Sequence, residues 1–345
     1  MQQGAGGKGA LAIEACGMVT SVGLTAAATC AAIRAGVQGL SDTRFVDSER
    51  QPVRAGQVRL ERPWRGADKI RRMVTLAAQE CLSSVVTTNR VPFVACLSDD
   101  LDDDAGDGLF DALAAASGVR LDEASSRILR AGRSSIAFAL QGARELLFDR
   151  GFDHVLVVAG DSLVTRAAIA RLEDEDRLLA ADNMDGFLPG EAAAAIVVTR
   201  PTRESDLVCL GIGAATEVAT IASEEPRRAE GLVAAIRAAL AEASLAPEDI
   251  DVRVTDLSGE HYYFREAALA LSRVVRSGRK EIPLWHPAEC IGEVGVAVGP
   301  ILAGVALTST RKRYAPGANF LLHLADDGGA RAALVLQATR SAHGQ

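Results

Sequence analysis

The strongest constraint on the fold is an alternation of short apolar runs with longer helical patterns over the first 200 residues. Short apolar runs bounded by polar or glycine-rich segments are typical of buried strands, and apolar residues spaced three and four apart are typical of helices. The strand-like runs are 11–16, 93–97, 155–158 and 193–198, and the helical patterns are 25–35, 68–85 and 136–148. This alternation predicts an α/β domain whose helices cover the faces of its sheet.

The second half of the chain repeats this plan. Ala-Ala-Ile-Arg occurs at 31–34 and again at 234–237, and segment 252–260 parallels 92–100, because both contain Leu-Ser, then a small or acidic residue, then an acid. The further strand-like runs are 207–211, 320–324 and 332–336, and the further helical patterns are 228–243, 264–275 and 294–307. An internal repeat of this size is typical of a duplicated fold.

A polar, turn-forming segment at 201–206 separates the two copies. We therefore predict an N-terminal half over 11–200 and a C-terminal half over 207–340, preceded by a flexible N-terminus over 1–10. The acid-rich stretch 99–107 is predicted to be a surface loop, and the basic cluster 69–72 to be a solvated helix start.

Composition excludes several classes of protein. The 345 residues carry a net charge of −8, which argues against nucleic acid as a partner. Six cysteines are scattered without Cys-x-x-Cys spacing and without neighbouring histidine clusters, so we expect no disulfide framework, no metal site and no cofactor. Residues 1–9 lack the apolar core of a signal peptide, and run 294–307 is too short and too glycine-rich to span a bilayer. We expect a cytoplasmic protein.

Several short motifs follow one another in a fixed order. Segment 13–23 reads Ile-x-x-x-Gly-Met-Val-Thr-x-Val-Gly, and segment 185–191 reads Asp-Gly-Phe-Leu-Pro-Gly-Glu before a run of alanines. Ala-Pro-Glu-Asp-Ile-Asp at 246–251 leads into a strand-like run, and Gly292, Gly295 and Gly299 follow. Together these motifs resemble the β-ketoacyl-[acyl-carrier-protein] synthase family, within the thiolase superfamily.

The resemblance implies a thiolase fold, in which two βαβαβαββ halves form a five-layered αβαβα sandwich. It also implies a homodimer, or a heterodimer with another ketosynthase-like subunit, with an acyl carrier protein as a further partner. Fatty acid or polyketide biosynthesis is the implied setting.

The catalytic residues of that family are replaced in this chain. A ketosynthase carries its acyl group on a cysteine at the start of a buried helix, assisted by two histidines and a lysine. Counting back from Gly151 places Ser134 at the cysteine position, whereas alignment on Ala143 and Arg144 places Gly132 there. The two histidine positions fall on Asp256 and Glu293. The lysine position falls near Ala288, and the late glycine-rich loop is reduced to 325–329.

These replacements predict the loss of condensation. A serine hydroxyl needs an adjacent base to become a nucleophile, and ionised carboxylates do not donate hydrogen bonds to an enolate. Arg133 is a candidate to neutralise Asp256 or Glu293 in a structural ion-pair cluster, since buried carboxylates need such a partner. We therefore predict a non-condensing scaffold or accessory subunit.

Two alternatives remain open at this stage. His261 and His286 lie close in sequence to the two lost histidine positions, and either could act as the base for Ser134 in a serine-dependent acyltransferase or hydrolase. A ketosynthase with divergent activity is the other alternative. Ser134 and Ser135 also have a structural use as N-caps of the helix that follows, and the two histidines as ordinary surface residues.

Overall fold

The computed structural model describes residues 9–98, 106, 108–275 and 281–339. Its strands are β1 Leu11–Val19, β2 Leu40–Val46, β3 Pro52–Gly56, β4 Phe93–Leu97, β5 Arg127–Leu129, β6 His154–Ser162, β7 Glu191–Thr199, β8 Leu207–Thr216, β9 Val252–Thr255, β10 Leu284–Trp285, β11 Asn319–Ala325 and β12 Ala330–Ala338. Its α-helices are α1 Ala26–Arg34, α2 Gly66–Leu82, α3 Leu109–Ala116, α4 Ser135–Phe148, α5 Arg166–Asp174, α6 Glu230–Ala243, α7 His261–Val274, α8 Ala288–Ile291 and α9 Val298–Arg311.

The strand order repeats about the centre of the molecule. Ten strands are connected in the order β10-β9-β11-β12-β8-β1-β7-β6-β4-β5. A short antiparallel contact joins the two halves, where Leu11 faces Cys209 and Ala12 faces Val208. Read outward from this contact, β1-β7-β6-β4-β5 corresponds to β8-β12-β11-β9-β10, with two antiparallel pairings followed by two parallel ones in each half. This order is that of a duplicated fold.

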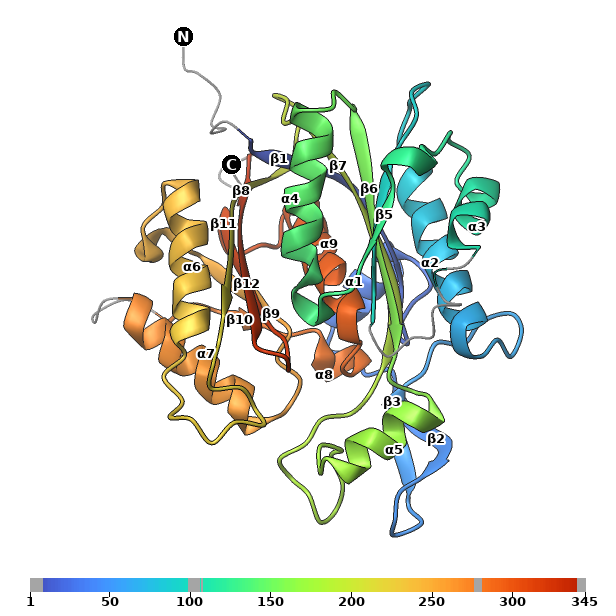
Figure 1. Cartoon of the computed structure of the whole chain (residues 1–345), viewed down its shortest axis with the longest axis vertical. Coiled ribbons are helices and arrows are strands. Elements are labelled where there is room, and N and C mark those ends of the chain that lie inside the picture. The colour runs from blue at the N-terminus through green and yellow to red at the C-terminus, as the bar shows by residue number, and fades with distance from the viewer. Residues whose placement is uncertain (1–8, 99–105, 107, 276–280, 340–345) are drawn as a thin grey trace.

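The longer helices form three layers around the two half-sheets, as Figure 1 shows. Helices α4 and α9 lie between the half-sheets, α2 and α3 cover the outer face of the first, and α6 and α7 cover the outer face of the second. Alternation along β6 records the same layering, because Val157 belongs to the central core and Val158 to the outer core beneath α2. The predicted five-layered αβαβα sandwich is confirmed.

Helix α9 is buried over almost its whole length, as its apolar sequence predicts. The helix begins at Val298, four residues later than the sequence pattern indicates, because a 3-10 turn over Gly295–Ala297 precedes it. Gly295 has φ of +57°, and an added Cβ would lie 1.9 Å from Oδ2 of Asp161. Among the described residues, no helix is both long and apolar enough to cross a membrane.

The β2–β3 hairpin and α5, which the sequence pattern did not predict, pack together below the main sheet in Figure 1. Both are short and mostly polar, so their apolar pattern is weak. The N-terminal residues 1–8 and the acid-rich loop, apart from residue 106, lie outside the described residues. The limits of the two halves, at 200 and 207, stay a prediction.

Candidate functional site

The start of α4 lies in the middle layer, where the resemblance places the acyl-carrying residue. Edge strand β5 leads through a 3-10 turn, Gly132–Ser134, directly into this helix. Gly132 has φ of +54°, and an added Cβ would lie only 1.7 Å from Oδ2 of Asp326. The backbone N–H of Arg133 donates to the same Oδ2 over 3.0 Å. A glycine is therefore needed for the turn to approach the β11–β12 loop.

Ser134 is fully buried at this turn. Its hydroxyl donates to the backbone carbonyl of Ala330 over 3.2 Å, and the hydroxyl of Ser135 donates to the carbonyl of Gly132 over 2.6 Å. The expected N-cap role is therefore not observed, since neither hydroxyl accepts from a free N–H of α4 in these bonds and Ser134 makes no side-chain cap. Both hydroxyls instead hold the turn and the β12 strand start in place.

Arg133 precedes Ser134 in this turn, and its side chain is buried. Its Nη1 donates to Oε2 of Glu293 over 3.0 Å, and its Nη2 donates to Oδ1 of Asp327 over 2.6 Å. Its Nε lies 4.0 Å from Oδ2 of Asp256. The guanidinium also stacks on the ring of Tyr263, with 4.6 Å between the guanidinium carbon and the ring centroid. The predicted pairing of Arg133 with Asp256 and Glu293 is confirmed.

The two carboxylates are buried and held by backbone groups as well. Asp256 follows β9 directly, and its Oδ2 accepts from the N–H of Ala325 over 2.8 Å. Burial raises the pKa of Asp256 to about 7, against the opposing effect of the Arg133 charge and of this hydrogen bond. Glu293 accepts from the N–H of Gly295 over 2.9 Å, so it also fixes the turn that opens α9.

A second, half-buried arginine, which the sequence pattern did not predict, extends the cluster. Arg177 follows α5 and donates from Nε and Nη2 to the two carboxylate oxygens of Glu260, over 2.7 and 2.8 Å. Arg177 also pairs with Asp327, and the hydroxyl of Tyr263 donates to Asp327. Burial by itself would raise the pKa of Asp327, but the charges of Arg133 and Arg177 hold this pKa well below its usual range. We call Arg133, Arg177, Asp256, Glu260, Glu293 and Asp327 the arginine–carboxylate cluster.

A cavity of about 200 Å³ remains beside this cluster. Its wall includes the side chains of Arg133, Arg177, Glu293 and Asp327, together with Phe187. A ligand that enters this cavity meets charged side chains that already form ion pairs with one another. The wall of this cavity therefore includes charged side chains, which is unlike an apolar channel for an acyl chain.

None of the six cysteines has the environment of an activated nucleophile. Five are buried, Cys16 is half-buried, and all six are free thiols. A reactive thiol needs a lowered pKa from a positive neighbour or a helix start. Burial instead raises the pKa of each, to about 12 for Cys16, Cys96 and Cys209 and above the usual value for Cys30, Cys81 and Cys290.

The two histidines of the serine alternative lie elsewhere. His261 is the first residue of α7 and is largely exposed, with Nδ1 3.4 Å from Oδ2 of Asp185. His286 precedes α8, and its Nε2 lies 2.7 Å from Oε1 of Glu289. Since the Ser134 hydroxyl donates to a backbone carbonyl, the contacts of the described residues do not assemble a Ser134–His pair. Ala288, at the lysine position of the resemblance, is the first residue of α8.

A metal site is not apparent in the described part of the chain, which holds no cluster of three or more His, Cys, Asp or Glu residues arranged to bind an ion. The expectation of no metal and no cofactor stays a prediction.

The fold is similar to that of known ketosynthases, both in sequence relatives and in solved structures. No family model matches the chain. The chain is 32% identical over 175 residues to a protein of Streptomyces cyaneus named as polyketide β-ketoacyl synthase 2. It is 33% identical over 134 residues to the ketoacyl synthase beta subunit of the tetracenomycin polyketide synthase of Streptomyces glaucescens. These matches cover 46% and 38% of the chain and 42% and 32% of the relatives, so the chain spans less than half the length of either.

Solved structures match over a larger part of the chain. One match is a chain in the structure of a type II polyketide synthase acyl-carrier protein in complex with its ketosynthase bound to the hexaketide. It has a TM-score of 0.81 at 14% identity, and the match covers 95% of this chain and 99% of that one. A ketosynthase in complex with its chain length factor from Xenorhabdus doucetiae gives a TM-score of 0.75 at 16% identity, covering 95% and 98%. At these identities the structural match shows the fold alone. Together with the sequence relatives, it confirms the resemblance to β-ketoacyl synthases.

Proposed function

We infer that this chain is a ketosynthase-like subunit without condensing activity, and that it acts beside an active ketosynthase. The observation that carries the proposal is the position of Arg133, whose buried guanidinium bridges Glu293 and Asp327 in front of the start of α4. In this proposal Ser134, Asp256 and Glu293 stand where the family has its cysteine and two histidines. Condensation requires a thiolate and donors for an enolate, and the cluster supplies a paired cation and anions instead.

The names of the relatives support an accessory role. One sequence relative is a beta subunit of a ketoacyl synthase, and one structural neighbour is a ketosynthase complexed with its chain length factor. A partner of the same fold is therefore proposed for this chain, with an acyl carrier protein as a second, transient partner. A cytoplasmic location remains part of the proposal.

The sheet offers an edge for such a partner. β5 is the last strand of the first half-sheet, and Ile128 on it is 42% exposed. Phe138 on the neighbouring helix α4 is 37% exposed. An exposed strand edge beside apolar side chains favours pairing with a second chain. A homodimer through the same edge is the alternative assembly.

The experiment is co-purification with an active type II polyketide ketosynthase from the same organism, followed by native mass spectrometry and a condensation assay. We expect a one-to-one complex in which product forms only when the partner retains its own cysteine. Ile128→Asp should abolish the complex, whereas Val86→Asp, at a position that is 96% exposed, should leave it intact. Product formation by this chain without the partner would contradict the proposal.

The serine-dependent alternative has no specific observation in its favour. Ser134 is buried and bonded to Ala330, while His261 and His286 contact Asp185 and Glu289.

A further inference from the structure

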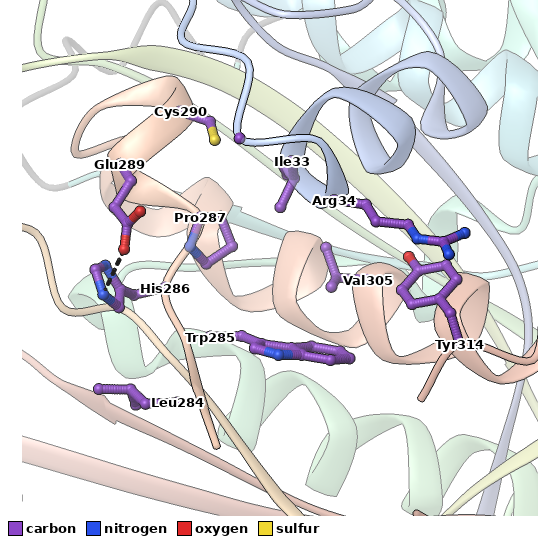
Figure 2. Close-up of a pocket in the computed structure, with 11 residues that line it drawn as sticks. Ile33, Arg34, Leu284, Trp285, His286, Pro287, Glu289, Cys290, Val305 and Tyr314 are labelled. Atoms are coloured by element: carbon purple, nitrogen blue, oxygen red, sulfur yellow. Dashed lines mark ion pairs between the residues drawn. The ribbon is translucent and has the colours of Figure 1, made fainter. Parts of the chain in front are cut away.

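A second pocket, of about 400 Å³, lies away from the arginine–carboxylate cluster and shares no lining residue with the cavity beside it. Figure 2 shows its side chains, which come from the end of α1, from β10 and the α8 segment, from α9, and from Tyr314 beyond α9. Its volume lies within the range of small-molecule sites. Neither the arginine–carboxylate cluster nor the proposed partner surface accounts for this pocket.

One end of the pocket carries an unneutralised cation. The guanidinium carbon of Arg34 lies 4.3 Å from the centroid of the Tyr314 ring. Within the described part of the chain, the structure gives Arg34 no ion pair with a carboxylate. A guanidinium that stacks by its face keeps the N–H groups of its edge free to donate, and that planar fork matches a carboxylate.

The negative group of the pocket is already paired. Glu289 lies at the opposite end, and its Oε1 is 2.7 Å from Nε2 of His286, as the dashed line in Figure 2 marks. Phe264 packs edge-on against the imidazole, with 5.7 Å between ring centroids, and so holds it in this orientation. Glu289 is thus held by His286 at the end of the pocket opposite Arg34, and Arg34 is the cation available to an anionic ligand. The net charge of −8 makes this positive point a local feature that general basicity does not explain.

Between the two ends the lining is aromatic and apolar. Trp285 lies across the floor in Figure 2, with its ring centroid 6.2 Å from that of Tyr314 and the planes inclined by 39°. Ile33 and Val305 form the adjacent apolar wall. A flat apolar body fits against such rings, since aromatic faces prefer offset or tilted contacts.

We propose that this pocket binds a small carboxylic acid with a flat aromatic or apolar body, its carboxylate on Arg34 and its body against Trp285 and Tyr314. The site is independent of condensation and of the partner subunit. Arg34 and Trp285 are the specificity residues, the first for charge and the second for shape.

Tryptophan fluorescence tests the proposal, because the chain has only two tryptophans, at positions 64 and 285. In a Trp64→Phe background, Trp285 alone reports on the pocket. The probes are 3-phenylpropionate and its neutral amide, 3-phenylpropanamide. We expect a saturable fluorescence change with the acid, and binding about tenfold tighter than that of the amide, as a charge-assisted hydrogen bond provides.

Arg34→Gln should remove the preference for the acid over the amide. The matched control is Arg150→Gln, which removes another exposed arginine stacked on an aromatic ring, that of Phe152. This control should leave both affinities unchanged. Absence of saturation, equal affinity for acid and amide, or an unchanged preference in Arg34→Gln would each overturn the proposal. Tighter binding of a four-residue peptide with a C-terminal phenylalanine carboxylate would assign the pocket to a protein segment and would also overturn it.

Discussion

Arg133 Nη1 lies 3.0 Å from Oε2 of Glu293, although 160 positions separate the two residues in sequence. The first residue belongs to the turn that opens α4, and the second precedes the turn that opens α9. Both helices lie in the middle layer, so one ion pair joins their starts, in the region where the proposed function places the lost nucleophile. The chemistry of the site depends on this contact.

Removal of the Arg133 charge should destabilise the protein strongly. Arg133→Met leaves Glu293 and Asp256 buried without their cation, which typically costs about 3–5 kcal/mol. Chemical denaturation monitored by circular dichroism measures the loss. Arg150→Met, at an exposed position, should change the stability by less than about 0.5 kcal/mol. Addition of Glu293→Gln to Arg133→Met should restore part of the loss, and an unaltered stability in Arg133→Met would show that the cluster is not structural.

Asp256 should make stability fall as pH rises. Its folded pKa, about 7, lies above the unfolded value of 3.8, so between these values the folded state binds the extra proton. Its contribution to stability is therefore largest below pH 4 and is lost as pH rises to 7. Asp256→Asn keeps an acceptor for Ala325 N–H and removes the titration.

The comparison to make is the free energy of unfolding of Asp256→Asn and wild type between pH 5 and 8. Relative to the variant, the wild type should lose up to about 1.4 kcal/mol per pH unit within the window below pH 7, and no more above it. A difference between the two proteins that stays constant with pH would contradict this assignment.

Gly132→Ala should destabilise the turn before α4 for two reasons. The left-handed φ alone costs an alanine about 1–2 kcal/mol, and the new Cβ also meets Asp326. Gly151→Ala separates the two causes, since Gly151 has φ of +76° with open space around its Cβ position. We expect the Gly132 variant to lose more stability than the Gly151 variant. Equal losses would mean that the Asp326 contact relaxes without cost.

No thiol of the native protein should react rapidly at pH 7. Burial raises the pKa of all six cysteines, and the thiolate is the reactive form. Titration with Ellman's reagent should give slow labelling in buffer and six equivalents in guanidinium chloride. One equivalent reacting within seconds in buffer would reveal an activated cysteine and would contradict the site as described.

The alternation of strand-like and helical runs, together with the internal repeat, predicts a duplicated α/β fold, and the family resemblance adds the five-layered sandwich. The position of Arg133 beside Asp256 and Glu293 also follows from the sequence, since the resemblance places all three at one helix start. Asp327 and Arg177 could not be placed in the same way. Asp327 lies in the β11–β12 loop and Arg177 in the segment after α5. Both segments reach the start of α4 only through tertiary packing, which the sequence pattern does not show. The acidic pair at 326–327, in the reduced late loop, is a signal in the sequence that could have indicated Asp327.

His261 and His286 illustrate the opposite limit. Nearness in sequence to Asp256 and Glu293 suggested a relocated base, but the helix start of α7 directs His261 to solvent beside Asp185. His286 pairs with Glu289 along its own segment. Nearness in sequence does not determine in which direction a side chain points at a helix start. The directions of these two histidine side chains follow only from the fold.

The central claim is that a paired arginine, Arg133, stands at the N-terminus of α4 in place of the catalytic residues for condensation. The most direct test is release of labelled carbon dioxide from a malonyl thioester by the purified chain alone, compared with Ser134→Ala. The account predicts equal release from both proteins, at the rate of the uncatalysed reaction. Multiple turnovers by the native chain that disappear in Ser134→Ala would contradict it.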